Sequence, residues 1–72
     1  MGQHEAIVQY LKAHPEGITP MDAFHTLHIT KLATRVSELI RAGFPIVKKP
    51  EAVRHEDGTT VRYTRYTLEV LA

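Results

Sequence analysis

Apolar residues recur at helical spacing in the first part of the chain and at strand spacing towards its end. In residues 3–14 the apolar positions are separated by three or four residues, which is typical of one buried helical face. Pro15 and Gly17 follow and are expected to end this helix. The predicted buried face carries Ile7, Tyr10, Leu11 and His14.

A second helix is predicted to begin at Pro20. Thr19 can cap it, Pro20 suits the first helical position, and Asp22 stands three residues after the cap. Ile18, just before the cap, is a candidate for a strand of one or two residues. The inward residues of this helix are expected to be Ala23, Phe24 and Leu27.

A tight turn should separate this helix from a third one at residues 30–42. The turn needs a residue at positive φ, and His28 is the candidate because histidine is enriched there, although glycine is more comfortable. Ile29 is expected to point into the core, Thr30 to cap the third helix, and Gly43 to end it. The third helix should bury Leu32, Val36, Leu39 and Ile40.

After Gly43 the pattern predicts two strands joined by a turn at Asp57-Gly58, the strongest short hairpin signal in the chain. A two-residue loop there would place Pro50 opposite Arg65. Proline cannot complete a strand ladder, so an edge or an irregularity is expected at Pro50. The tip, residues 51–63, should project into solvent. Val61 and Tyr63 are predicted to share one face, and Tyr66, Leu68 and Val70 the other.

The length of 72 residues predicts a single domain, 1–72, without cysteine and therefore without a disulfide or thiolate metal site. No apolar run approaches the roughly 20 residues that cross a bilayer. The first residues show no basic stretch followed by an apolar run, so a cytoplasmic location is expected.

Charge is distributed unevenly, although the net charge is only +1. Residues 1–27 carry one lysine against three carboxylates, whereas residues 28–72 carry eight lysines and arginines against five carboxylates. Such asymmetry favours an anionic partner. A solvated surface on a small protein is the alternative explanation.

Residues 17–47, GITPMDAFHTLHITKLATRVSELIRAGFPIV, with the later hairpin ending in RYTRYTL, resemble small winged helix-turn-helix proteins common in bacteriophages and prophages. His28 departs from the family pattern, which often has glycine there. The positions that match the pattern are Gly17, Ala23, Leu27, Ile29, Arg35, Leu39 and Gly43.

The resemblance implies an α+β fold, a winged helix-turn-helix of three helices plus a C-terminal β-hairpin wing, with a short strand at Ile18. It implies DNA binding through the third helix, with no catalysis and no cofactor. The residues agree on the last point, since they offer no paired carboxylates, no glycine-rich phosphate loop and no nucleophile–base spacing. A metal site is not expected either, because His25 and His28 would supply only two ligands.

The third helix should enter the major groove with its N-terminal half. Arginine and lysine can donate to guanine, and threonine can donate, accept or touch a thymine methyl. For Arg35 a bracing salt bridge to Asp22 is the alternative, and Glu38 can pair with Arg35 or Arg41 instead of accepting from cytosine. The base-facing candidates are Thr30, Lys31, Thr34 and Arg35.

Cations on the wing alternate with threonine and tyrosine, a composition suited to phosphate contacts that fix orientation without reading bases. Lys48 and Lys49 could instead protect an edge strand from aggregation. Glu56 and Asp57 at the tip argue against deep insertion into the minor groove. The candidates for contacts to the DNA backbone are Lys48, Lys49, Arg54, Arg62 and Arg65.

Two functions follow from these observations. The first is a double-stranded DNA-binding protein of phage or mobile-element type, acting as a transcriptional regulator or as an excisionase-like accessory factor. One small unit covers limited surface, so a homodimer on repeated or palindromic half-sites is expected, paired through the first helix, the wing or Val70-Leu71. The second is a winged helix that binds a protein, such as an inhibitor of a host factor.

Overall fold

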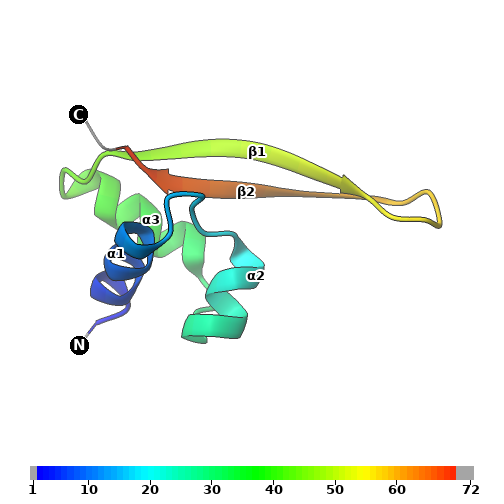
Figure 1. The fold of residues 1–72 in the computed structure, drawn as a ribbon. Helices are drawn as coiled ribbons and strands as arrows, with labels where there is room; N and C mark the ends of the chain where they lie inside the picture. Colours follow the sequence, from blue (N-terminus) through cyan, green and yellow to red (C-terminus); the bar gives the residue numbers. More distant parts are fainter. Residues whose placement is uncertain (1, 70–72) are drawn as a thin grey trace.

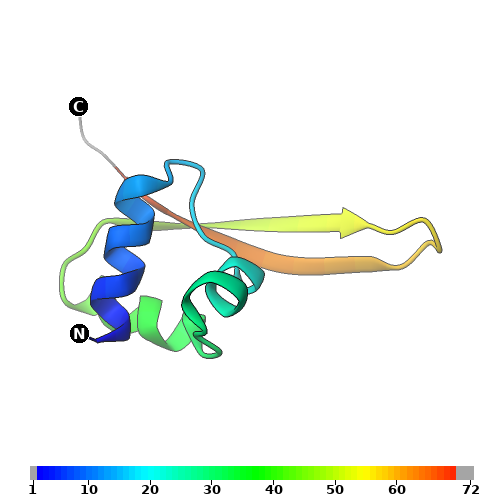
Figure 2. The same ribbon diagram turned by 60° about the horizontal axis from the view of Figure 1, so that its bottom comes forward.

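A computed structural model describes residues 2–69. Its helical part consists of α1 (Gln3–Ala13), α2 (Pro20–Asp22), the π turn η1 (Ala23–Leu27) and α3 (Leu32–Arg41). The strands β1 (Ile46–Arg54) and β2 (Thr60–Leu68) form an antiparallel hairpin. The hairpin lies across one side of the helices, and its tip extends well beyond them (Figures 1 and 2). The three helical segments and the hairpin confirm the predicted fold.

The core lies between α1, α3 and the base of the hairpin. Ile7, Ile18, Ile29 and Val36 are its largest fully buried side chains, and Tyr66 joins them from β2. Ile7 and Leu11 of the predicted stripe are buried, Tyr10 packs against the core partly buried, and Val8 is buried although it was not predicted. His14 follows α1 and stacks on Tyr10, with 4.0 Å between the ring centroids.

The second helix begins as predicted, with a reciprocal capping box. Thr19 Oγ1 accepts a hydrogen bond from the Asp22 N–H, and the Asp22 carboxylate accepts one from the Thr19 N–H, each at 3.1 Å. The helix then widens into η1, where Ala23 is buried. The prediction that Phe24 points inward is wrong, because its side chain is 52% exposed. Phe24 lies about 100° around the helix from Ala23, which places it at the margin of the buried face.

The turn between η1 and α3 has the predicted conformation at His28, where φ is 58°. The Ile29 N–H closes it by donating to the Ala23 carbonyl oxygen at 3.0 Å. The prediction that Thr30 caps the third helix is wrong: the helix begins at Leu32, and Lys31 stands at the cap position without a side-chain hydrogen bond. Ile40 is 37% exposed and not buried as expected, because it lies about 100° from Leu39 at the edge of the apolar stripe.

The hairpin register differs by one residue from the prediction. Pro50 pairs with Thr64, not with Arg65, and Arg54 pairs with Thr60. The loop has three residues, not two, because the His55 N–H donates to the Thr59 carbonyl oxygen at 2.8 Å. Gly58 alone adopts a positive φ in this loop, at 92°. A one-residue shift moves the side chains of one strand to the opposite face relative to the other strand.

The ladder runs without interruption past Pro50, so the predicted irregularity is absent from β1 and β2. Ile18 forms a bridge to Tyr66, which confirms the short strand, and the pair exchange backbone hydrogen bonds at 2.8 and 2.9 Å. The backbone N–H and carbonyl of Tyr66 bond to Ile18 and therefore point away from its β1 partner, Lys48. Lys48 and Tyr66 thus form a non-hydrogen-bonded pair, and so do the other even-numbered pairs of β1 and β2. Pro50 occupies such a position, where β1 is an edge and its missing N–H costs nothing.

No helix among residues 2–69 is long and apolar enough to cross a membrane. Val70, predicted to share a strand face with Tyr66 and Leu68, and Val70-Leu71, one of the three predicted dimer contacts, lie outside the described residues.

Candidate nucleic-acid interface

The N-terminal half of α3 presents polar side chains to solvent. Thr30, Lys31 and Thr34 are all exposed. Thr34 lies roughly opposite Leu32 on the helix, since two residues turn it by about 200°. The structure therefore places three of the four base-facing candidates on an accessible surface.

The N-terminus of α3 has no side-chain cap, in contrast to the capping box of α2. Its first N–H groups therefore remain available, and the helix dipole adds partial positive charge at this end. Lys31 stands at the cap position. Together these features provide an environment that favours an anion such as a phosphate.

Arg35 is placed differently from the other base-facing candidates. Its Nη1 lies 3.2 Å from Oε1 of Glu38, and its side chain is 29% exposed. The alternative pairing with Asp22 is not formed: among residues 2–69 the ion pair of Arg35 is with Glu38, and the Asp22 carboxylate accepts from the Thr19 N–H. The predicted pairing of Glu38 with an arginine three residues away is confirmed for Arg35.

Glu38 has a second partner that the sequence did not indicate. Nε2 of His4 in α1 lies 2.7 Å from the same Glu38 oxygen, Oε1. Hydrogen bonding to His4, followed by the positive charge of Arg35, holds the pKa of the Glu38 carboxyl below its usual range. Because 34 residues separate His4 from Glu38, no local pattern could have shown this contact.

The register of the hairpin sorts the wing cations onto two faces. Even-numbered residues share one face and odd-numbered residues the other, because Ala52 pairs with Arg62 and Glu51 with Tyr63. The even face carries no carboxylate within the two strands. Its cations, all exposed, are Lys48, Arg54 and Arg62.

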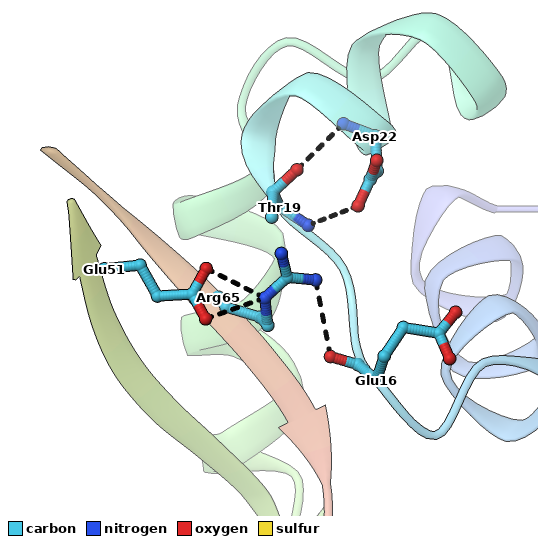
Figure 3. Close-up of polar contacts among 5 residues, drawn as sticks. All are labelled: Glu16, Thr19, Asp22, Glu51 and Arg65. Atoms are coloured by element: carbon cyan, nitrogen blue, oxygen red, sulfur yellow. Dashed lines mark hydrogen bonds and ion pairs between the residues drawn. The ribbon is translucent and has the colours of Figure 1, made fainter. Parts of the chain in front are cut away.

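The odd face carries two cations, Lys49 and Arg65, and the carboxylate Glu51. Arg65 donates from Nε to both carboxylate oxygens of Glu51, each at 3.0 Å, and from Nη1 to the Glu16 carbonyl oxygen at 3.4 Å (Figure 3). Arg65 therefore connects the wing to the loop before α2, and its donors are engaged by these partners. Lys49 is the other cation of this face and is exposed.

A groove separates the odd face from the start of α2. Its cavity volume is about 430 Å³. Met21, Val53 and Val61 line it and are 64%, 43% and 47% exposed, respectively. The remaining lining residues are Thr19, Pro20, Asp22, His55, Tyr63 and Arg65.

The arrangement of three helical segments, a bridge at Ile18 and a projecting hairpin defines a helix-turn-helix with a wing. A family model described as a winged helix-turn-helix domain matches residues 2–70. The chain therefore belongs to the winged helix-turn-helix family, whose members are typically DNA-binding domains without catalytic activity. No match was found among curated proteins or among solved structures.

Proposed function

We propose that this protein binds double-stranded DNA, with the N-terminal half of α3 in the major groove and the even face of the wing on the phosphate backbone. The observation that carries the proposal is the segregation of charge on the wing, which leaves Lys48, Arg54 and Arg62 together without a carboxylate on their face. Cations so arranged suit a line of phosphates, whereas the +1 net charge of the chain alone does not.

The dimensions of the wing support this placement. Each strand has nine residues and spans about 30 Å at 3.3 Å per residue. The major groove is about 12 Å wide, so a wing of this length reaches the backbone beside a groove that α3 occupies. Thr30, Lys31 and Thr34 are the residues we assign to the bases. Arg35 joins them only when it leaves Glu38.

We further propose that the protein is of phage or mobile-element type and acts in the cytoplasm as a transcriptional regulator or an excisionase-like accessory factor. A single unit of 72 residues buries little surface on DNA, which favours two copies on repeated or palindromic half-sites. The length of the selected site and its internal symmetry test the stoichiometry.

Selection of bound fragments from random duplex DNA, followed by affinity measurements at several salt concentrations, tests the function. Each phosphate that is neutralised should contribute about −0.9 to the slope of log affinity against log salt. The three wing cations lead us to expect a slope of about −2.7 or steeper. Absence of binding to any duplex at about 50 mM salt, where phosphate contacts are strongest, would reject the proposal.

A second candidate function is recognition of a protein, and the groove beside α2 favours it. Exposed apolar side chains that line a concavity, here Met21, Val53 and Val61, are typical of sites for protein or small-molecule partners. This function uses the odd face of the wing, whereas DNA binding uses the even face. Substitution of Met21 by Ser therefore separates the two, because it should leave DNA affinity unchanged.

A further inference from the structure

Two side-chain nitrogens, from His4 and Arg35, contact a single oxygen between α1 and α3. His4 Nε2 lies 2.7 Å from Oε1 of Glu38, and Arg35 Nη1 lies 3.2 Å from the same atom. The contacts are accessible, since the side chains of His4 and Glu38 are 44% and 41% exposed. A change at His4 therefore acts directly on the carboxylate that holds Arg35.

Arg35 is incompletely satisfied in this position. Its Nε is buried and has no hydrogen-bond partner. A buried donor without a partner carries a desolvation cost. The Glu38 contact at 3.2 Å is thus the one ion pair that the structure gives this guanidinium, among the described residues. Weakening that pair would favour a rotamer in which the guanidinium reaches solvent or DNA.

The charge state of His4 decides how strongly Glu38 holds Arg35. A neutral imidazole can donate an N–H to Oε1 but supplies no charge, so Arg35 remains the main counter-ion at this oxygen. An imidazolium supplies a full positive charge at the shorter distance and repels the neighbouring guanidinium. Arg41, on the same helix, is the other charged group that acts on Glu38. It adds positive charge and does not replace Glu38 as a partner for Arg35.

We propose that His4 is a positioning residue for base recognition: when protonated, it takes over Oε1 of Glu38 and releases Arg35 from α3 towards a guanine. The proposal rests on the proposed DNA-binding function. Histidine is the side chain whose charge ordinarily changes between pH 5 and 8, so the tests below compare the two ends of that range. Glu38 keeps its charge, because hydrogen bonding to His4 and the charge of Arg35 lower its pKa further from an ordinary value that is already acidic.

The first test needs no DNA. Nuclear magnetic resonance can follow the ring carbon-bound protons of His4 and the Nε–H group of Arg35 in the free protein between pH 8 and pH 5.5. Mobility of the Arg35 side chain should increase as the His4 signal titrates. In the His4→Gln variant, which keeps a neutral donor, Arg35 mobility should not depend on pH. An Arg35 signal that is indifferent to His4 titration in the wild type would overturn the proposal.

The second test measures base discrimination. The affinity for a selected duplex is divided by that for a duplex with one guanine-containing base pair replaced, at pH 6 and at pH 8 and at constant salt. A change of charge elsewhere on the protein alters binding to both duplexes alike and cancels in this ratio.

In the wild type, the affinity ratio at the base pair that Arg35 reads should be about fivefold higher at pH 6 than at pH 8. Fivefold corresponds to about 1 kcal/mol, the lower end of the discrimination that an arginine–guanine contact provides. His4→Gln should show the low ratio at both pH values, whereas the control His25→Gln should behave as the wild type. A wild-type pH profile in His4→Gln would overturn the positioning role. Failure of the wild type to bind any duplex would instead reject the proposed function, and with it the DNA part of this inference.

Discussion

Arg54 and Arg62 project from the same face of the wing, because Arg54 pairs with Thr60 and Arg62 with Ala52. In the register predicted from Asp57-Gly58 as a two-residue loop, they would lie on opposite faces. Lys48 lies on the same face as Arg54, and Glu51 on the other, because side chains alternate along β1. The turn thus determines which cation of β2 shares a face with Lys48 and Arg54: Arg62 in the actual register, and Arg65 in the predicted one.

Replacement of Arg62 by Gln should weaken binding to all duplexes alike and reduce the magnitude of the salt slope by about 0.9, because one phosphate contact is lost. Fluorescence anisotropy at salt concentrations from about 50 to 200 mM measures both effects. Lys49→Gln is the matched control, since Lys49 is exposed on the odd face. Equal losses in the two variants would show that the wing does not use one face.

Replacement of His28 by Gly should raise the melting temperature. A non-glycine residue at φ 58° carries a steric cost of roughly 1–2 kcal/mol in the folded state. Glycine removes this cost, but it also increases the entropy of the unfolded chain, which offsets roughly 0.4–1 kcal/mol of the gain. The melting temperature should rise by a few degrees, because 1 kcal/mol in the free energy of unfolding corresponds to about 4–8 °C in a domain of this size. Circular dichroism provides the measurement. His25→Gly, within η1, should lower the melting temperature instead, and a decrease in His28→Gly would contradict the strain argument.

Replacement of Gly17 by Ala should destabilise the fold strongly. Gly17 has a φ of 95°, and an added Cβ would overlap the Tyr66 carbonyl oxygen and lie 2.7 Å from Thr67 Cγ2. The bridge between Ile18 and Tyr66 would have to separate, with a loss of about 3 kcal/mol or more in the free energy of unfolding.

Gly43→Ala is the control for this substitution. Its φ of 104° is equally unfavourable, but nothing lies within 4 Å of an added Cβ. Only the conformational cost of about 1–2 kcal/mol should appear. Urea denaturation compares the two variants. Equal losses would mean that strain alone, and not the close approach of the loop to β2, makes glycine necessary at position 17.

Replacement of Glu51 by Gln should lower the melting temperature at pH 7 and make it less dependent on pH in the acid range. Hydrogen bonding from Tyr63, followed by that from Arg65, lowers the pKa of Glu51. A carboxylate whose pKa is lower in the folded state stabilises the fold above its unfolded pKa, and this contribution disappears as pH falls through the folded pKa. The wild type should therefore melt at a higher temperature than Glu51→Gln at pH 7, and the difference should shrink below about pH 4.5. A difference that is constant with pH would contradict the assignment.

The sequence predicted the helices well where local chemistry decides them. Thr19 and Asp22 form the expected capping box, and His28 takes the expected left-handed conformation. Both features depend on backbone geometry within a few residues. The exposure of Phe24 and Ile40 was missed because each lies at the margin of a periodic stripe, where the tertiary contacts decide burial.

The register of the wing could not be decided from Asp57-Gly58 alone. This pair suits a two-residue loop with positive φ at both positions and equally a three-residue loop with positive φ at glycine only. Asp57 Oδ1 accepts from the N–H and the hydroxyl of Thr59, at 2.9 and 2.6 Å, which stabilises the longer loop. Threonine two residues after the aspartate was the signal that could have favoured it.

The base-facing and backbone-facing assignments remain predictions. Thr30, Lys31 and Thr34 lie on an exposed surface, as DNA contact requires, whereas Arg35 and Arg65 are held by Glu38 and Glu51. Periodicity shows which side of a helix faces solvent. Periodicity does not show which residue of another element a side chain contacts, so it could not predict the contact between His4 and Glu38.

The most direct test of the central claim is a titration of isotope-labelled protein with a selected duplex, followed by the backbone amide signals. We predict that the largest shifts will occur at residues 30–35 and around Arg54 and Arg62 on the wing. Signals around Met21, which lines the groove beside α2, should change little. Shifts confined to that groove, or no shifts at any DNA concentration, would contradict the account.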